Sequence, residues 1–171
     1  MVILYKMEIL EKNSKTPKRR SKSEDIVEKH LKLMGIDFEY EDRFCLKGDG
    51  GLARLFYPDF HLKKYGIVVE YRGGLKPEDG ETEEHYQERV EEYLERQEIK
   101  RKLYEKQGIS VVEIKPDDLW ILEDGNCKGV RKDFRETLTY KIYEKIYERG
   151  RNPIGLGDVK SYLGNYYSRA A

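Results

Sequence analysis

The sequence is poor in the residues that build disulfide frameworks and zinc sites. Its 171 residues include only two cysteines and three histidines, and Cys45 and Cys127 belong to no CxxC pair. A disulfide-stapled secreted domain and a zinc centre are therefore disfavoured. Two isolated thiols are typical of a reducing compartment, so we expect an intracellular, cytoplasmic protein.

Long apolar runs are missing as well. No stretch approaches the roughly 18 apolar residues that a membrane-spanning helix needs, so we expect no membrane partner. The apolar start Met-Val-Ile-Leu-Tyr is too short for the hydrophobic part of a signal peptide. A length of 171 residues fits one domain that is large enough to bury a core.

Net charge is absent, but the charges are unevenly distributed. Residues 1–22 hold seven Lys and Arg against two Glu, a balance of +5, and residues 126–171 hold ten bases against five acids, again +5. The stretch between them therefore carries −10. Basic flanks around an acidic centre fit a protein that approaches a polyanion and holds cations in the middle. Solvated charged tails and helices produce the same pattern.

Apolar periodicity predicts an α/β domain. Ser21 and Glu24 form a capping-box pattern that starts a helix, and Pro58 indicates an edge position or an irregularity in its strand. The expected elements in chain order are helix 22–34, strands 36–41, 53–62 and 67–72, helix 82–107, strand 109–114, a short helix from Pro116, and helix 129–149. This order predicts a mixed central sheet.

Two carboxylates are expected to face each other on neighbouring strands. If residues 63–66 form a four-residue hairpin loop, Leu62 pairs with Ile67 and Asp59 lies directly opposite Glu70. Opposite residues have β-carbons about 4.5–5.5 Å apart, so two like charges destabilise the sheet unless a cation lies between them. Mg²⁺ prefers one or two carboxylates together with water and phosphate oxygens. The alternative is an ordinary strand pair whose acids face water.

Two basic residues are candidates for the position beside this carboxylate pair. Arg72 follows Glu70 by two positions and shares its face, where a fixed charge can stabilise a phosphate during reaction. Lys100 and Gln97 belong to the stripe of helix 82–107 that is predicted to face inward, and inward polar groups need partners. Lys100 can instead extend its ammonium group to the surface. The complete stripe is Tyr86, Val90, Tyr93, Gln97, Lys100 and Tyr104.

Three further features are candidates for the same site. Glu24 either caps its own helix or points into the site as a third carboxylate. His61 shares the face of Asp59 and can orient water or bind phosphate. The basic lead-in, with Lys18, Arg19 and Arg20, can hold a nucleic-acid backbone without reading its bases.

Five short segments between Ser21 and Ile109, taken together, resemble the PD-(D/E)xK nuclease superfamily. They are most similar to its small very-short-patch-repair-like and helicase-associated nuclease domains. The resemblance covers about residues 20–121. Each motif is short, and it is their order and spacing that carry the resemblance. The segments are Ser21-x-x-Glu24, Gly35-Ile-Asp-Phe-Glu-Tyr-Glu41, Tyr57-Pro-Asp-Phe60, Val68-Val-Glu-Tyr-Arg-Gly73 and Tyr93…Lys100…Tyr104…Gly108-Ile.

The resemblance implies a restriction-endonuclease-like αβββαβ core over residues 21–122, with a basic flexible extension at 1–20 and a C-terminal helical extension at 123–171. It implies hydrolysis of DNA phosphodiester bonds with Mg²⁺ or Mn²⁺, and no small-molecule cofactor. Asp59 and Glu70 match the metal ligands, Glu24 matches a helix Glu that often completes the site, and the main-chain carbonyl of Tyr71 matches a further ligand.

The sequence departs from the family pattern at one position. Arg72 stands where the family usually has Lys, and an arginine cannot act as a general base because it does not give up its proton. In some branches the lysine has moved to the following helix, and Lys100 matches that placement. Arg72 and Lys100 both remain candidates for the role of this lysine, and Lys100 is slightly favoured as the group that positions the attacking water. The expected function is a DNA endonuclease, with a homodimer compatible with cutting both strands. The alternative is a non-catalytic nucleic-acid-binding protein.

Overall fold

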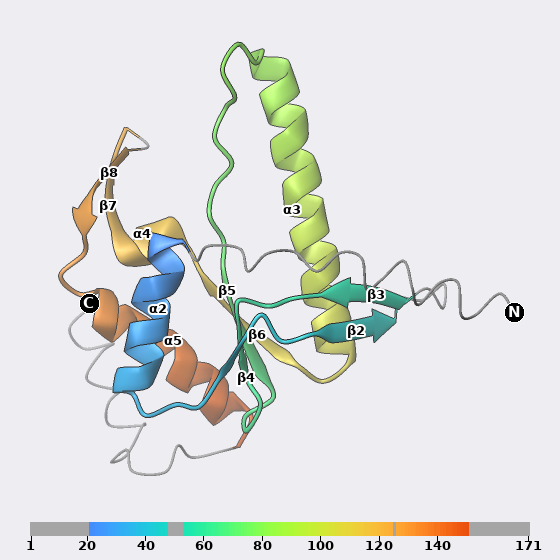
Figure 1. Ribbon diagram of the computed structural model, residues 1–171, viewed down its shortest axis with the longest axis vertical. Helices are drawn as coiled ribbons and strands as arrows, with labels where there is room; N and C mark the ends of the chain where they lie inside the picture. The colour runs from blue at the N-terminus through green and yellow to red at the C-terminus, as the bar shows by residue number, and fades with distance from the viewer. Residues whose placement is uncertain (1–20, 48–52, 125, 151–171) are drawn as a thin grey trace, which may run out of the picture.

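A computed structural model describes residues 21–47, 53–124 and 126–150 of the chain. Within these residues lie four helices and eight strands (Figure 1). The elements are α2 (Lys22–Leu33), β1 (Glu39–Tyr40), β2 (Phe44–Lys47), β3 (Ala53–Phe56), β4 (Phe60–Leu62), β5 (Ile67–Tyr71), α3 (Glu83–Lys106), β6 (Ser110–Ile114), α4 (Pro116–Leu119), β7 (Trp120–Glu123), β8 (Asn126–Val130) and α5 (Phe134–Glu148).

The central sheet is mixed, as the sequence predicted. Its strand order is β1-β4-β5-β6, in which β4 is antiparallel to both neighbours and β5 is parallel to β6. The parallel pair follows from α3, because a chain must cross over before it can return in the same direction. The order of the core elements is therefore helix, strand, strand, strand, helix, strand, with the hairpin β2–β3 inserted after the first strand.

The two faces of the sheet bury different clusters. Ile67 and Val69 of β5 belong to the larger cluster, which α2 and α5 complete. Val68, which points the opposite way because strand side chains alternate, packs with Leu46 of β2 and Tyr104 of α3. The C-terminal end of α3 and the hairpin β2–β3 therefore lie on one face, and α2 and α5 lie on the other (Figure 1).

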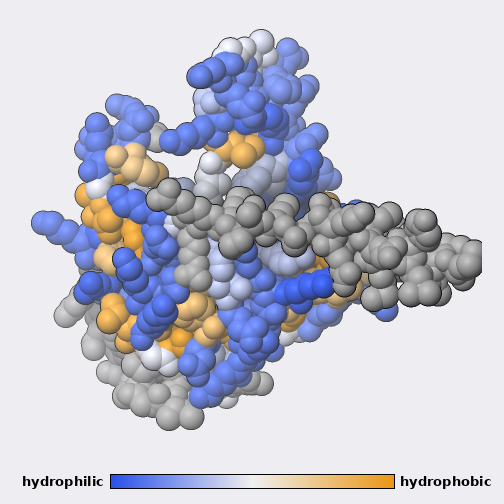
Figure 2. Space-filling model, in the orientation of Figure 1, coloured by the Kyte–Doolittle hydropathy of each residue, from blue (hydrophilic) through white to orange (hydrophobic). Residues whose placement is uncertain are grey.

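The first half of α3 projects from the body of the protein together with the segment 72–82, which runs alongside it (Figure 1). We call this projection the arm. Tyr104, near the C-terminal end, is the one buried residue of α3. Polar contacts hold the arm together: the hydroxyl of Tyr93 donates to the carbonyl of Gly73 at 3.1 Å, and that of Tyr86 donates to the carbonyl of Leu75 at 3.0 Å. Figure 2 shows its surface as largely hydrophilic.

Two expected strands differ from the structure. The strand expected over 36–41 is reduced to the two residues of β1. The strand expected over 53–62 is two strands, β3 and β4, in different sheets. Pro58 lies in the break between them, and it offers no N–H group for a ladder. The irregularity predicted at Pro58 is thus a complete change of sheet.

The helix expected over 129–149 begins only at Phe134, because the hairpin β7–β8 precedes it. Asp124 adopts a positive φ of 50° at the hairpin turn. The sequence carries Asp-Gly at this point, which is a strong hairpin signal. In the described residues, no helix combines the length and apolarity that crossing a bilayer demands.

Candidate functional site

Asp59 and Glu70 meet where β4 begins and β5 ends. The predicted register is confirmed, since Leu62 pairs with Ile67 and Phe60 with Val69. Asp59 precedes β4 by one residue, and its Oδ2 accepts a hydrogen bond from the main-chain N–H of Tyr71 at 2.6 Å. The two carboxylates thus lie at the same end of the β4–β5 strand pair. The carbonyl of Tyr71 as a ligand stays a prediction.

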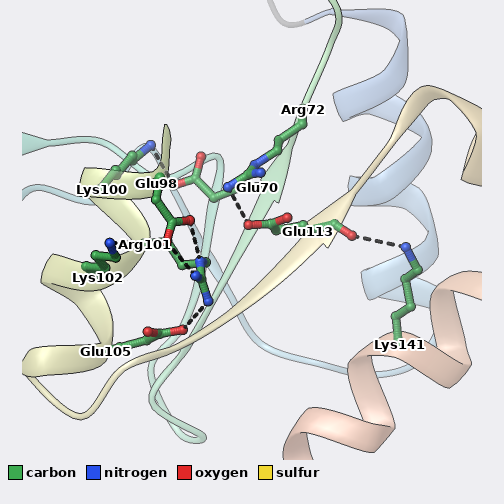
Figure 3. A network of polar contacts seen from close by, with 9 residues as sticks. All are labelled: Glu70, Arg72, Glu98, Lys100, Arg101, Lys102, Glu105, Glu113 and Lys141. Atoms are coloured by element: carbon green, nitrogen blue, oxygen red, sulfur yellow. Dashed lines mark hydrogen bonds and ion pairs between the residues drawn. The ribbon is translucent and has the colours of Figure 1, made fainter. Parts of the chain in front are cut away.

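Lys100, rather than Arg72, pairs with the buried carboxylate of this site. Its Nζ lies 2.6 Å from Oε1 of Glu70, and the hydroxyl of Tyr104 lies 3.5 Å from the same oxygen. Arg72 directs its guanidinium to Glu113 on β6 (Figure 3). The inward stripe predicted for α3 therefore places Lys100 at the site, while Arg72 has another partner.

Burial and mutual repulsion make this acidic pair unfavourable as two charges. The pKa of Asp59 is raised to about 7, mainly because burial removes the carboxyl group from water and, to a smaller extent, because the charge of Glu70 lies nearby. Burial also raises the pKa of Glu70, although the neighbouring Lys100 opposes that shift. A buried carboxylate pair in which the pKa of both groups is raised by burial, and that of Asp59 also by the charge of Glu70, is typical of functional sites, and a bound cation would remove the cost.

Glu24 caps its own helix. Its carboxylate accepts hydrogen bonds from Ser21, completing the capping box, and Oε2 also accepts one from the hydroxyl of Tyr40 at 2.6 Å. Its charge still contributes to raising the pKa of Asp59. Across the described parts of the chain, no three His, Cys, Asp or Glu side chains are grouped closely enough to hold a metal ion. The structure therefore unites Asp59 and Glu70 and leaves Glu24 at their edge.

His61 lies on the α3 face of the sheet and is held by a carboxylate that the sequence did not single out. Its Nδ1 is 2.7 Å from Oδ2 of Asp42, and its ring packs edge-on against Phe44. The hydrogen bond to His61 is the main cause that lowers the pKa of Asp42. A carboxylate that binds one ring nitrogen orients a histidine and leaves the other nitrogen for a different partner.

Gln97 lies beside the site, as predicted. It lines one small cavity together with Glu70, Lys100 and Tyr104. The remaining residues predicted to bind DNA, Lys18, Arg19 and Arg20, lie outside the described residues.

Glu113, like Asp42, is an acidic residue of this region that the sequence did not single out. It pairs in register with Glu70 on the parallel strand β6, so both carboxylates lie on the same face. Parallel register depends on how α3 returns the chain, and no local sequence signal reports it.

Comparisons with protein-family models, with curated proteins and with solved structures found no match to this chain.

Proposed function

We propose that the protein is a metal-dependent nuclease that hydrolyses DNA phosphodiester bonds on a restriction-endonuclease-like core. The observation that carries the proposal is the arrangement of Asp59, Glu70 and Lys100. The two carboxylates lie at the same end of the β4–β5 strand pair, and the ammonium group of Lys100 lies 2.6 Å from the carboxylate of Glu70. The order of core elements, with a mixed sheet and an α3 crossover, supports the proposed core type.

The donor set fits a hard divalent cation such as Mg²⁺ or Mn²⁺. One oxygen of each carboxylate has a partner within the protein, namely the N–H of Tyr71 for Asp59 and Nζ of Lys100 for Glu70. In the described part of the chain no hydrogen bond engages the other oxygen of either group. Mg²⁺ is commonly bound through one or two carboxylates while waters and substrate phosphates complete its shell.

The residues of the chain have distinct parts in the proposed reaction. A divalent cation held by Asp59 and Glu70 would polarise the phosphoryl group as a Lewis acid and would lower the pKa of a water molecule. The hydrogen bond from Tyr71 orients Asp59, and Lys100 orients Glu70. The positive charge of Lys100 also offsets negative charge that develops on the phosphate. Arg72 contributes charge nearby while it remains paired with Glu113.

The charge distribution supports DNA as the polyanion. The basic flanks 1–22 and 126–171 each carry +5. Lysine and arginine contacts to phosphates are independent of base sequence and release counterions, so binding weakens steeply as salt concentration rises. A cytoplasmic location and a homodimer that cuts both strands belong to the same proposal.

A non-catalytic nucleic-acid-binding protein is the second candidate. The observation that favours it is the engagement of Glu24 in capping and of Arg72 with Glu113, which leaves two carboxylates and one lysine at the site. This candidate predicts a salt-sensitive mobility shift of DNA that needs no metal ion and forms no cleavage products.

The deciding experiment incubates plasmid, single-stranded and branched DNA with the full chain in the presence of Mg²⁺, Mn²⁺ or EDTA. We expect cation-dependent cleavage that Asp59→Ala and Glu70→Ala abolish, while Glu95→Ala on the exposed surface of α3 retains it. Linearised or nicked plasmid identifies endonuclease action. Cleavage by the two site variants at the wild-type rate would rule out the proposed site, and binding without products would favour the second candidate.

A further inference from the structure

Four charged side chains alternate across the α3 face of the sheet. Lys100 pairs with Glu70, and Arg72 pairs with Glu113 (Figure 3). Glu70 and Glu113 are register partners on adjacent parallel strands, and both ion pairs line the same small cavity. This arrangement gives every charge one partner of opposite sign.

Arg72 and Glu70 line the same small cavity, so Glu70 is an alternative partner for the guanidinium. It follows Glu70 by two positions on the same face, and its charge lowers the pKa of the Glu70 carboxyl. An arginine presents a planar fork that binds both oxygens of a carboxylate. A guanidinium that bound Glu70 in this way would occupy the oxygen that Lys100 leaves for a cation.

Strand β6 keeps Arg72 in its observed position. The main-chain N–H of Arg72 donates to the carbonyl of Ile114 at 2.8 Å, while its side chain reaches Glu113. Glu113 is itself anchored, because its main-chain carbonyl accepts from Nζ of Lys141 at 3.2 Å, and that nitrogen lies 2.5 Å from Asp118. Contacts from α5 and α4 thus hold the strand end that carries Glu113.

We propose that Glu113 is a positioning residue that holds the guanidinium of Arg72 away from Glu70 and so leaves the Glu70 carboxylate available to a divalent cation. The inference rests on the proposed cation site at Asp59 and Glu70. It assigns Glu113 no contact with the cation or with DNA. Groups that orient the ligands of a metal site typically change metal affinity about 10–100-fold when they are mutated.

The test measures Mn²⁺ binding to the full chain by titration calorimetry, without DNA, for the wild type, Glu113→Gln and the double variant Glu113→Gln/Arg72→Gln. We expect Glu113→Gln to bind Mn²⁺ about tenfold more weakly, because the released guanidinium competes for Glu70. The double variant has no guanidinium to release, so its affinity returns to within about twofold of the wild type. Glu98→Gln, which removes a carboxylate paired with Arg101 on α3, is the matched control and retains wild-type affinity.

The double variant tests the inference even if Glu113→Gln alone does not fold, because it removes both members of the ion pair. Weak Mn²⁺ binding by the double variant would overturn the positioning role and make Glu113 a direct contributor to the cation site. Wild-type affinity in a folded Glu113→Gln protein would overturn it as well. If the wild type bound no Mn²⁺, the proposed function itself would fail, and the inference with it.

Discussion

The ammonium nitrogen of Lys100 lies 2.6 Å from Oε1 of Glu70, and this ion pair joins the C-terminal half of α3 to the middle strand pair of the sheet. Both side chains are largely buried, with exposed fractions of 17% and 11%. A buried charge without a partner is costly, so neither group is expected to tolerate loss of the other. The pair therefore links the packing of α3 to the chemistry of the site.

Replacing Lys100 by Met is expected to destabilise the protein. The substitution keeps an apolar stem of similar length and removes the charge that Glu70 needs, so we expect the free energy of unfolding to fall by about 1–3 kcal/mol. Urea denaturation at pH 8 measures this change. Adding Glu70→Gln to the same chain is expected to recover part of the loss. Additive losses would contradict a direct partnership between the two residues.

Replacing Asp59 by Asn is expected to stabilise the metal-free protein at pH 8. Because the pKa of Asp59 is raised to about 7, the folded state resists the ionisation that the unfolded chain undergoes near pH 4. The resulting cost appears as pH rises from about 4 to about 7 and is complete at pH 8. We expect Asp59→Asn to gain about 1–3 kcal/mol there and almost nothing at pH 4.

Calorimetry at the two pH values measures this gain, with Asp37→Asn on the exposed surface as the control. Adding Mn²⁺ at pH 8 is expected to raise the melting temperature of the wild type but not of Asp59→Asn, since the proposed cation site requires both carboxylates in the folded protein. Equal stability of Asp59→Asn and wild type at pH 8 would mean that the pair carries no electrostatic strain.

His30 is expected to make the protein sensitive to mild acid. It is buried between α2 and α5 with Nε2 2.8 Å from the hydroxyl of Thr139, and burial together with the nearby Arg135 lowers its pKa to about 4. The unfolded chain takes up this proton near pH 6.5, so stability is complete above that pH and is lost as pH falls towards 4. We expect a contribution of about 1–2 kcal/mol to be lost between pH 7 and pH 5.

The measurement compares the free energy of unfolding at pH 7 and pH 5 for wild type, His30→Gln and His85→Gln. The His30 variant is expected to show a flatter dependence on pH, whereas the exposed His85 serves as the control. A slope in His30→Gln as steep as that of the wild type would assign the acid sensitivity to other groups.

The arm is expected to open locally without unfolding the body. Arg89 holds segment 72–82 on α3, since it donates to the carbonyl of Lys76 at 3.0 Å and pairs with Glu78 and Glu81. Arg89→Met is expected to speed amide exchange in residues 73–82 about tenfold and leave β5 and β6 protected, because the arm adds little to the buried core.

Hydrogen–deuterium exchange with mass spectrometry measures this opening. Arg96→Met is the matched control, because among the described residues Arg96 pairs only with the exposed Glu92 on the same helix. Faster exchange in β5 or β6 of Arg89→Met would show that the arm and the body unfold as one unit.

Local sequence patterns were sufficient for part of the fold and of the candidate site. The four-residue turn at 63–66 predicted the β4–β5 register, in which Leu62 pairs with Ile67, because hairpin pairing depends on neighbours in the chain. The spacing of the α3 stripe likewise predicted which side of the helix contacts the rest of the protein. These two patterns together placed Asp59, Glu70 and Lys100 in one region.

Only the tertiary structure decided how the charges are paired. The sequence left both Arg72 and Lys100 as candidates beside Glu70, with Lys100 slightly favoured; in the structure Lys100 pairs with Glu70, while Arg72 pairs with Glu113, which β6 brings alongside β5. A parallel partner arrives through a crossover whose register no local motif records. The sequence by itself determined which charged residues share a face, since that follows from backbone periodicity. Their pairing was decided by packing between distant elements, because a buried charge takes the partner that the assembled fold brings within reach.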